Sequence, residues 1–156
     1  MAHHWGVVAS VNRRTLDDLL ADAEARIERF SPAEAHAATQ TGAVLIDIRS
    51  DSDRERSGIV PGSLHIPRTV LEWRTAPDGS FRNPHVGALD RQVILLCDHG
   101  CSTILAAAVL TELGFTRAGD VIGGFAAWRD ASLPVSRARS RRRSPDELPG
   151  MSPPDP

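Results

Sequence analysis

The sequence predicts an α/β fold in which a parallel sheet of about five strands is covered by helices on both faces. Short runs such as 43–46 and 93–96 indicate buried strands, because every side chain in them is apolar. Between these runs lie segments whose apolar residues recur at helical spacing. This alternation is typical of parallel sheets, whose neighbouring strands need a crossover connection.

Composition and charge narrow the class of protein. The chain has 156 residues, 41% of them hydrophobic, and a formal net charge of -2, so we expect one compact domain with some additional sequence and no general affinity for nucleic acid or membranes. No apolar stretch approaches the roughly 20 residues of a spanning helix, and the start lacks a secretory pattern. We expect a cytoplasmic protein whose two cysteines are reduced unless chemistry intervenes.

The first part of the chain predicts a flexible lead and two helices. Residues 1–14 show no periodic pattern. Over residues 15–30, apolar side chains recur at helical spacing among charged ones, which predicts a leading amphipathic helix. Ser31, Pro32 and Glu34 then supply the N-cap, first position and capping-box glutamate of a second helix that stops at Gly42.

The rest of the domain extends to residue 135, so that we assign the folded domain to residues 15–135. Apolar runs predict strands at 43–48, 64–66, 93–96 and 120–122. Helical patterns and caps predict helices at 50–56, 104–113 and 125–130, and a brief one opened by a capping box from Thr69 to Glu72. Residues 75–89 contain two prolines and two glycines and predict an irregular loop.

Residues 136–156 differ in kind from the domain. Five arginines lie between positions 137 and 143, and five prolines follow. With almost nothing apolar to bury, this Arg/Pro-rich tail is predicted to be disordered. The arginines are a candidate contact for RNA, anionic lipid or an acidic protein partner. A solvated tail without a specific partner is the favoured interpretation, because Asp146, Glu147 and Asp155 partly offset them.

Cys97 is the candidate nucleophile. It directly follows the apolar run 93–96 and opens the loop 97–103, which leads into the helix at 104–113. A residue at the carboxyl end of a parallel strand lies where α/β sheets bind ligands, and amides of the loop and of the helix's first turn point back toward it. Such a setting lowers the pKa of a thiol and stabilises a sulfur anion.

Four motifs in this order resemble the single-domain rhodanese family. They are Leu45–Arg49 followed by Glu55, Val60–Pro67, Val93–Thr103 and Val121–Trp128. The resemblance covers residues 31–135 and implies a three-layer rhodanese-like fold. It also implies a sulfurtransferase in which a loop of six residues, beginning at Cys97, cradles a persulfide.

The implied reaction transfers sulfane sulfur through Cys97. The thiolate attacks the outer sulfur of a small-molecule donor such as thiosulfate, keeps that sulfur as a persulfide, and passes it to a thiol or cyanide acceptor. Backbone amides of the loop are suited to hold the sulfur anion. The residues expected to form this cradle are Asp98, His99, Gly100, Cys101, Ser102 and Thr103. No cofactor is implied, and the histidines lack the ligand spacing of a metal site.

Loop length and charge separate this chemistry from that of related proteins. Phosphatases and arsenate reductases of the same superfamily resemble this chain but use a loop one residue longer, ending in an arginine that clamps an oxyanion. Here the arginine is missing, which favours persulfide chemistry. Asp98 places a negative charge beside Cys97, which disfavours a thiolate and predicts poor turnover of the thiosulfate dianion unless Asp98 points to solvent. Ser102 and Thr103 could donate neutral hydrogen bonds instead.

Several other residues have two interpretations. Cys101 could form a disulfide with Cys97, which needs Cα atoms within about 7 Å, or be a small buried residue at the helix start. Asp47 and Arg49 are expected to brace the active loop, with Arg49 paired to Glu55. Arg74 could line the pocket and attract a donor anion, or belong to a surface helix.

A non-enzymatic function is the alternative to catalysis. The chain could be a persulfide carrier or a thiol redox sensor that uses Cys97 and Cys101, with the tail contacting a partner protein. Turnover of a sulfur donor distinguishes the two hypotheses, because a carrier or a sensor shows none beyond a Cys97→Ser control.

Overall fold

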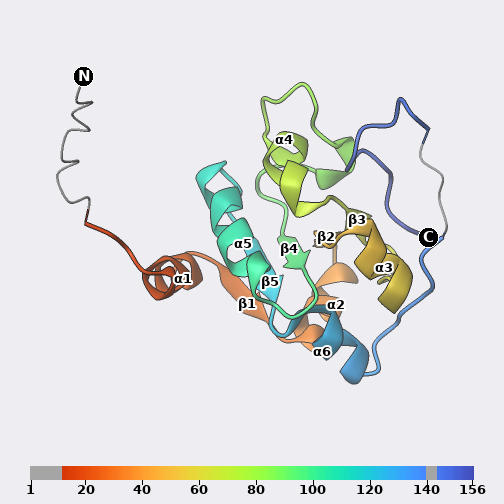
Figure 1. Ribbon diagram of the computed structural model, residues 1–156, viewed down its shortest axis with the longest axis horizontal. Coiled ribbons are helices and arrows are strands. Elements are labelled where there is room, and N and C mark those ends of the chain that lie inside the picture. Colours follow the sequence, from red (N-terminus) through yellow and green to blue (C-terminus); the bar gives the residue numbers. More distant parts are fainter. Residues whose placement is uncertain (1–11, 140–143) are drawn as a thin grey trace, which may run out of the picture.

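The computed structural model describes residues 12–139 and 144–156 and is shown in Figure 1. Its core is a sheet of five parallel strands in the order β1-β5-β4-β2-β3. The strands are β1 (Glu28–Phe30), β2 (Val44–Asp47), β3 (Leu64–His65), β4 (Val93–Leu96) and β5 (Ala118–Val121). The predicted parallel α/β sheet is confirmed.

Helices lie on both faces of this sheet (Figure 1). They are α1 (Leu16–Glu24), α2 (Pro32–Thr39), α3 (Asp51–Ser57), α4 (Leu71–Thr75), α5 (Ser102–Glu112) and α6 (Gly124–Asp130), with 3-10 turns η1 (Arg68–Val70) and η2 (Pro84–Val86). None of the described helices is long and apolar enough to cross a bilayer.

Alternation along the central strands divides the core into two layers. In β4, Val93 and Leu95 point to the face covered by α4 and α5, where they pack with Leu71 and Leu110. Ile94 and Leu96 point to the opposite face, where the side chains of α2 and α6 include Ala35, Phe125 and Trp128. Because both faces are covered, all four residues of β4 are apolar and fully buried.

The prediction of one helix over residues 15–30 is wrong at its carboxyl end. Helix α1 begins at a capping box of Thr15 and Asp18 but ends at Glu24. Residues 28–30 instead form strand β1, paired in parallel with β5. Helical periodicity continues through this segment, but the backbone of β5 offers an unpaired edge, and long-range pairing outweighs the local preference.

The brief helix after β3 also begins differently from the prediction. The predicted capping box at Thr69 does not form; η1 precedes α4, and neither has a side-chain cap. Other elements differ from prediction by only one or two residues at their ends, as in β5, predicted at 120–122 and observed at Ala118–Val121.

The tail differs most from the sequence-based expectation. The structure places residues 144–156 against the domain, with the backbone of Asp155 exchanging hydrogen bonds with Gly62 and Ser63. Asn83 is fully buried and donates from Nδ2 to the carbonyls of Gly150 and Ser152, each at 3.0 Å. The contacts use backbone carbonyls as acceptors for buried donors, so they leave no apolar pattern in the sequence.

Parts of two sequence-based predictions lie outside the described residues. These are most of the predicted lead over residues 1–14 and the part of the arginine run at positions 141–143.

Candidate active site

Cys97 lies at the carboxyl end of β4, as predicted, and is 7% exposed. The loop turns back on itself and enters α5 at Ser102. It docks against the start of α6, where the backbone N–H of Phe125 donates to the Cys97 carbonyl at 2.7 Å and that of Ala126 donates to the Asp98 carbonyl at 3.0 Å. The active loop is therefore fixed by backbone contacts with a neighbouring element.

Glycines permit this close approach. Gly100 has a φ of +78°, and a Cβ placed there would lie 2.7 Å from the backbone nitrogen of Gly123. Gly124 has a φ of +61°, and its Cβ would lie 2.3 Å from the Cys97 carbonyl oxygen. A side chain at either position would collide with backbone, so Gly100 and Gly124 allow the active loop to dock against the start of α6.

The loop presents hydrogen-bond donors to the sulfur. The Gly100 N–H donates to Cys97 Sγ at 3.2 Å, and Thr103 Oγ1 lies 3.6 Å from the same sulfur. Burial raises the pKa of the Cys97 thiol, but hydrogen bonds from Ser102, Thr103 and the Gly100 amide outweigh it, and the net pKa lies below its ordinary value. Cys97 is thus a buried thiol whose surroundings favour the thiolate form.

Thr103 connects the sulfur to a second group of residues that the sequence did not single out. Its hydroxyl donates to Asp120 Oδ2 at 2.8 Å. Asp120, fully buried in β5, in turn accepts from Arg29 Nε at 2.9 Å and Nη2 at 3.2 Å. The hydrogen bond to Asp120 raises the pKa of Arg29. A charged residue inside an otherwise apolar strand was the one sequence signal for this group.

Asp47 and Arg49 brace the site from β2. Arg49 donates to both carboxylate oxygens of Asp47 and to the Gly58 carbonyl, and its guanidinium lies 4.0 Å from the ring centre of Phe125. These contacts replace the predicted pair with Glu55. Arg49 Nη1 is buried without a hydrogen-bond partner and lies 3.6 Å from Asp98 Oδ1.

A cavity of about 320 Å³ opens above Cys97. It is lined by Ile48, Arg49, Ser50, Asp53, Cys97, Asp98, His99, Cys101 and Ser102. The structure therefore brings together most of the predicted active-loop residues. Gly100 and Thr103 do not line the cavity but contact the sulfur, and Cys101 is exposed rather than buried.

Arg74 lies outside this cavity. Its side chain is buried and donates from Nε to the Pro149 carbonyl at 2.6 Å and from Nη1 to the Phe81 carbonyl at 3.4 Å. Both acceptors belong to loops, so Arg74 holds the tail and the irregular loop together. The prediction that it lines the pocket was based on charge alone and did not foresee these carbonyls.

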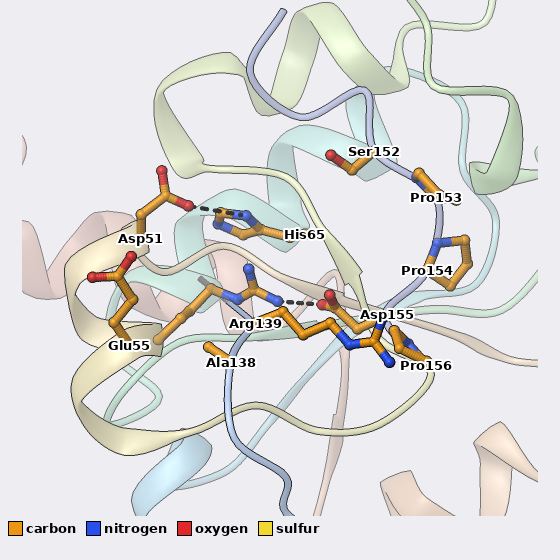
Figure 2. Close-up of a pocket in the computed structure, with 11 residues that line it drawn as sticks. Asp51, Glu55, His65, Ala138, Arg139, Ser152, Pro153, Pro154, Asp155 and Pro156 are labelled. Carbon is orange, nitrogen blue, oxygen red and sulfur yellow. Dashed lines mark hydrogen bonds and ion pairs between the residues drawn. The ribbon is translucent and has the colours of Figure 1, made fainter. Parts of the chain in front are cut away.

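A second cavity, of about 460 Å³, lies between α3, β3 and the tail (Figure 2). Figure 2 shows Asp51 directed toward His65, with residues of the tail forming the opposite wall. His65 Nε2 lies 2.8 Å from the Arg49 carbonyl, and burial lowers the pKa of the imidazole. Cys97 does not line this cavity. Among the described residues, no group of histidine, cysteine and acidic side chains is arranged to bind a metal.

Comparisons with known proteins agree with this geometry. Residues 31–131 match the family described as Rhodanese-like domain. Thiosulfate sulfurtransferase GlpE of Stutzerimonas stutzeri is 36% identical over 103 residues, which are 65% of this chain and 84% of that protein. Thiosulfate sulfurtransferase GlpE of Actinobacillus succinogenes is 34% identical over 110 residues, 70% of this chain and 90% of that protein.

Solved structures show the same fold. A Rhodopseudomonas palustris protein of unknown function, described as a possible tyrosine phosphatase, is 30% identical with a TM-score of 0.73, over 84% of this chain and all of that one. Thiosulfate sulfurtransferase from Pseudomonas aeruginosa has a TM-score of 0.63 at 20% identity, over 80% of this chain and 23% of that one. With these matches and a cysteine loop at the expected place, the chain belongs to the rhodanese-like domain family.

Proposed function

We propose that this protein is a sulfurtransferase that carries sulfane sulfur as a persulfide on Cys97, from a donor such as thiosulfate to a thiol or cyanide. The observation that carries this proposal is the hydrogen bond from the Gly100 amide to Cys97 Sγ, at 3.2 Å, in a loop that opens to a cavity. The relatives named thiosulfate sulfurtransferase support it. The lack of an arginine in residues 97–103 favours it over phosphate-ester hydrolysis.

Loading of the enzyme requires the thiolate form of Cys97. The thiolate attacks the outer sulfur of thiosulfate, the S–S bond of the donor breaks, and sulfite leaves with the electron pair. The product is Cys97–S–S⁻. The lowered pKa of Cys97 supplies the nucleophile, and the amide of Gly100 holds the inner sulfur in place.

Discharge returns the enzyme to its starting state. Cyanide or an acceptor thiolate attacks the outer sulfur of the persulfide, and the electron pair of the broken S–S bond stays on Cys97 Sγ. The leaving group is thus the same sulfur anion that the loop stabilises. One set of donors assists both halves of the cycle because negative charge develops on one atom.

Charge at the mouth of the cavity influences the choice of donor. Asp98 is 34% exposed in its side chain and lies 3.6 Å from Arg49 Nη1, so its charge is partly offset. Asp53 lies at the same mouth, and hydrogen bonds from Arg56 and Ser50 hold its pKa below the usual value. Two carboxylates facing the entrance repel a dianion, so we expect a high KM for thiosulfate and better use of less charged sulfane donors.

The test measures thiocyanate formed from thiosulfate and cyanide by the full chain, beside Cys97→Ser and Cys101→Ser variants. The proposal expects catalytic turnover by the wild type and none by Cys97→Ser. Cys101→Ser is the matched control, because it removes the other thiol of the same loop. Equal rates for the wild type and Cys97→Ser with thiosulfate and with a neutral organic polysulfide would overturn the proposal.

The redox alternative keeps one specific observation in its favour. Cys101 is exposed and belongs to the same loop as the buried Cys97. A sensor would lose two free thiols on mild oxidation and regain both on reduction, without turning over any sulfur donor. The sulfurtransferase proposal instead expects turnover to persist in Cys101→Ser.

A further inference from the structure

A closed ring of contacts links the Cys97 sulfur to the buried carboxylate of Asp120 on β5 and the partly buried guanidinium of Arg29 on β1. Thr103 Oγ1 lies 3.6 Å from Cys97 Sγ and donates to Asp120 at 2.8 Å. Asp120 accepts two hydrogen bonds from Arg29. Arg29 Nη2 also donates to the Gly100 carbonyl at 3.5 Å, and the amide of Gly100 returns to the sulfur at 3.2 Å. Thr103 and Gly100, which both contact the sulfur, therefore meet the same ion pair.

We propose that Asp120 and Arg29 are positioning residues that decide, through Thr103, whether a hydroxyl hydrogen points at the Cys97 sulfur. The inference rests on the proposed function in that Cys97 is taken as the reacting thiol.

The Thr103 hydroxyl has a single hydrogen to donate. Two atoms compete for it, Asp120 Oδ2 and Cys97 Sγ. In the structure the hydrogen goes to Asp120. The Thr103 oxygen then offers lone pairs to the sulfur, an arrangement that suits the S–H of a protonated Cys97.

Negative charge develops on the Cys97 sulfur when the persulfide is discharged. An acceptor thiolate attacks the outer sulfur of Cys97–S–S⁻; a new S–S bond forms, the old one breaks, and its electron pair remains on Cys97 Sγ. The sulfur anion now accepts hydrogen bonds but donates none. Rotation of the Thr103 hydroxyl moves its hydrogen from Asp120 to the sulfur, while Asp120 keeps both hydrogen bonds from Arg29. The ion pair makes this exchange possible without leaving a buried carboxylate unpartnered.

Other charged or titratable groups also face Cys97, and the test must separate them from the ring. Arg49 follows β2, Asp53 belongs to α3, and Asp98, His99 and Cys101 belong to the loop itself. All of them line the cavity above the sulfur, whereas Asp120 acts from beneath through Thr103. A double-mutant cycle on Asp120 and Thr103 isolates the effect that passes through the hydroxyl.

The experiment measures the rate of Cys97 alkylation by iodoacetamide against pH, in a Cys101→Ser background that leaves one thiol. In Asp120→Asn the amide oxygen still accepts from Arg29, and the NH₂ group faces Thr103. Because an NH₂ group cannot accept a hydrogen bond, the Thr103 hydroxyl then donates to the sulfur instead. We expect about fivefold more thiolate below the midpoint of the profile, consistent with one gained hydrogen bond. When Asp120→Asn is combined with Thr103→Val, no hydroxyl connects position 120 to the sulfur, and only the loss of the Asp120 charge remains. We expect the thiolate fraction to increase by less than about half as much in this double variant.

Controls distinguish this role from general damage to the fold. Thr75→Val removes the hydroxyl of another fully buried threonine, which bonds the Leu71 carbonyl at 2.7 Å, and should leave the alkylation profile unchanged. If Asp120→Asn does not fold, Thr103→Ser should retain the wild-type profile while Thr103→Val moves the midpoint to higher pH.

Two results would overturn the inference. One is that Asp120→Asn shifts the midpoint of the alkylation profile equally in the presence of Thr103 and in the Thr103→Val background. The other is an identical alkylation profile for Thr103→Ser and Thr103→Val. Alkylation needs no sulfur donor, so a protein that shows the coupling but no sulfur transfer would refute the proposed function alone.

Discussion

The active loop and the tail are both irregular segments held by hydrogen bonds, but they use opposite halves of the peptide group. The active loop (residues 97–103) turns an amide N–H inward, toward the sulfur of Cys97. The tail (residues 144–156) turns carbonyls inward, toward the buried side chains of Arg74 and Asn83. Amides directed into a cavity make an anion site, whereas carbonyls that satisfy buried cations and amides complete a fold.

The largest effect should come from the point where the active loop meets α6. A Cβ at Gly124 would lie 2.3 Å from the Cys97 carbonyl oxygen and 2.7 Å from the Asp98 carbonyl carbon. Gly124→Ala must therefore move the loop, and we expect sulfur transfer to fall by at least about 100-fold. The measurement is kcat/KM with one sulfur donor. Gly62→Ala is the matched control, because Gly62 also has a positive φ but nothing within 4 Å of its Cβ. Retained activity in Gly124→Ala would contradict the geometry of the loop.

Removal of residues 148–156 tests the tail in the same way. It leaves the buried donors of Asn83 and Arg74 without their carbonyl partners, and we expect the free energy of unfolding to fall by about 2–4 kcal/mol. Urea unfolding measures this change. A synthetic peptide of residues 148–156, added in excess, should restore part of the loss. An unchanged urea midpoint would show that the tail is not part of the folded domain.

A smaller effect is expected at the mouth of the cavity. Asp98→Asn removes a carboxylate beside Cys97 and leaves Arg49 Nη1 to attract anions. We expect kcat/KM for thiosulfate to rise about threefold to tenfold, with less change for a neutral organic polysulfide. Steady-state rates with both donors measure the difference. Asp130→Asn, at an exposed position in α6, is the matched control for loss of one surface charge. An equal gain for both donors would mean that charge does not select the donor.

The smallest effect concerns pH and His65. Burial lowers the pKa of His65 in the folded protein, so the unfolded chain takes up more protons once the pH falls below about 6.5, the ordinary value for histidine. Stability that is present above this pH should be lost as the pH falls further. We expect His65→Gln to lose less stability than the wild type between pH 7.5 and 5.5, by up to about 1 kcal/mol. Urea unfolding at both pH values checks this, and equal losses would show that folding does not lower the pKa of His65.

The sequence predicted the active loop far better than the tail, for a physical reason. The strand at 93–96 and the cysteine after it are local signals, and each maps to one structural requirement. The contacts of the tail join residues far apart in the chain, as Asn83 does with Gly150 and Ser152, and backbone carbonyls carry no sequence signature.

Within the site, the same distinction separates what was predicted from what was missed. Cys97 and the loop after it follow from local pattern, and Asp47 and Arg49 from their place around the end of a strand. The contact between Asp120 and Arg29 depends on the pairing of β1 with β5. The residues of β1 lie in a segment whose periodicity predicts a helix. For Arg74 the sequence left two interpretations, a pocket residue or part of a surface helix, and its carbonyl partners were visible only in three dimensions.

The central claim is that Cys97 is the residue that carries sulfur. The most direct measurement is mass spectrometry of the Cys97 peptide and the whole protein after exposure to a sulfane donor, with and without a reductant. We predict a gain of about 32 Da, one sulfur atom, on Cys97 that is lost on reduction and absent in Cys97→Ser. A reducible gain of sulfur that appears on Cys101 and persists in Cys97→Ser would contradict it.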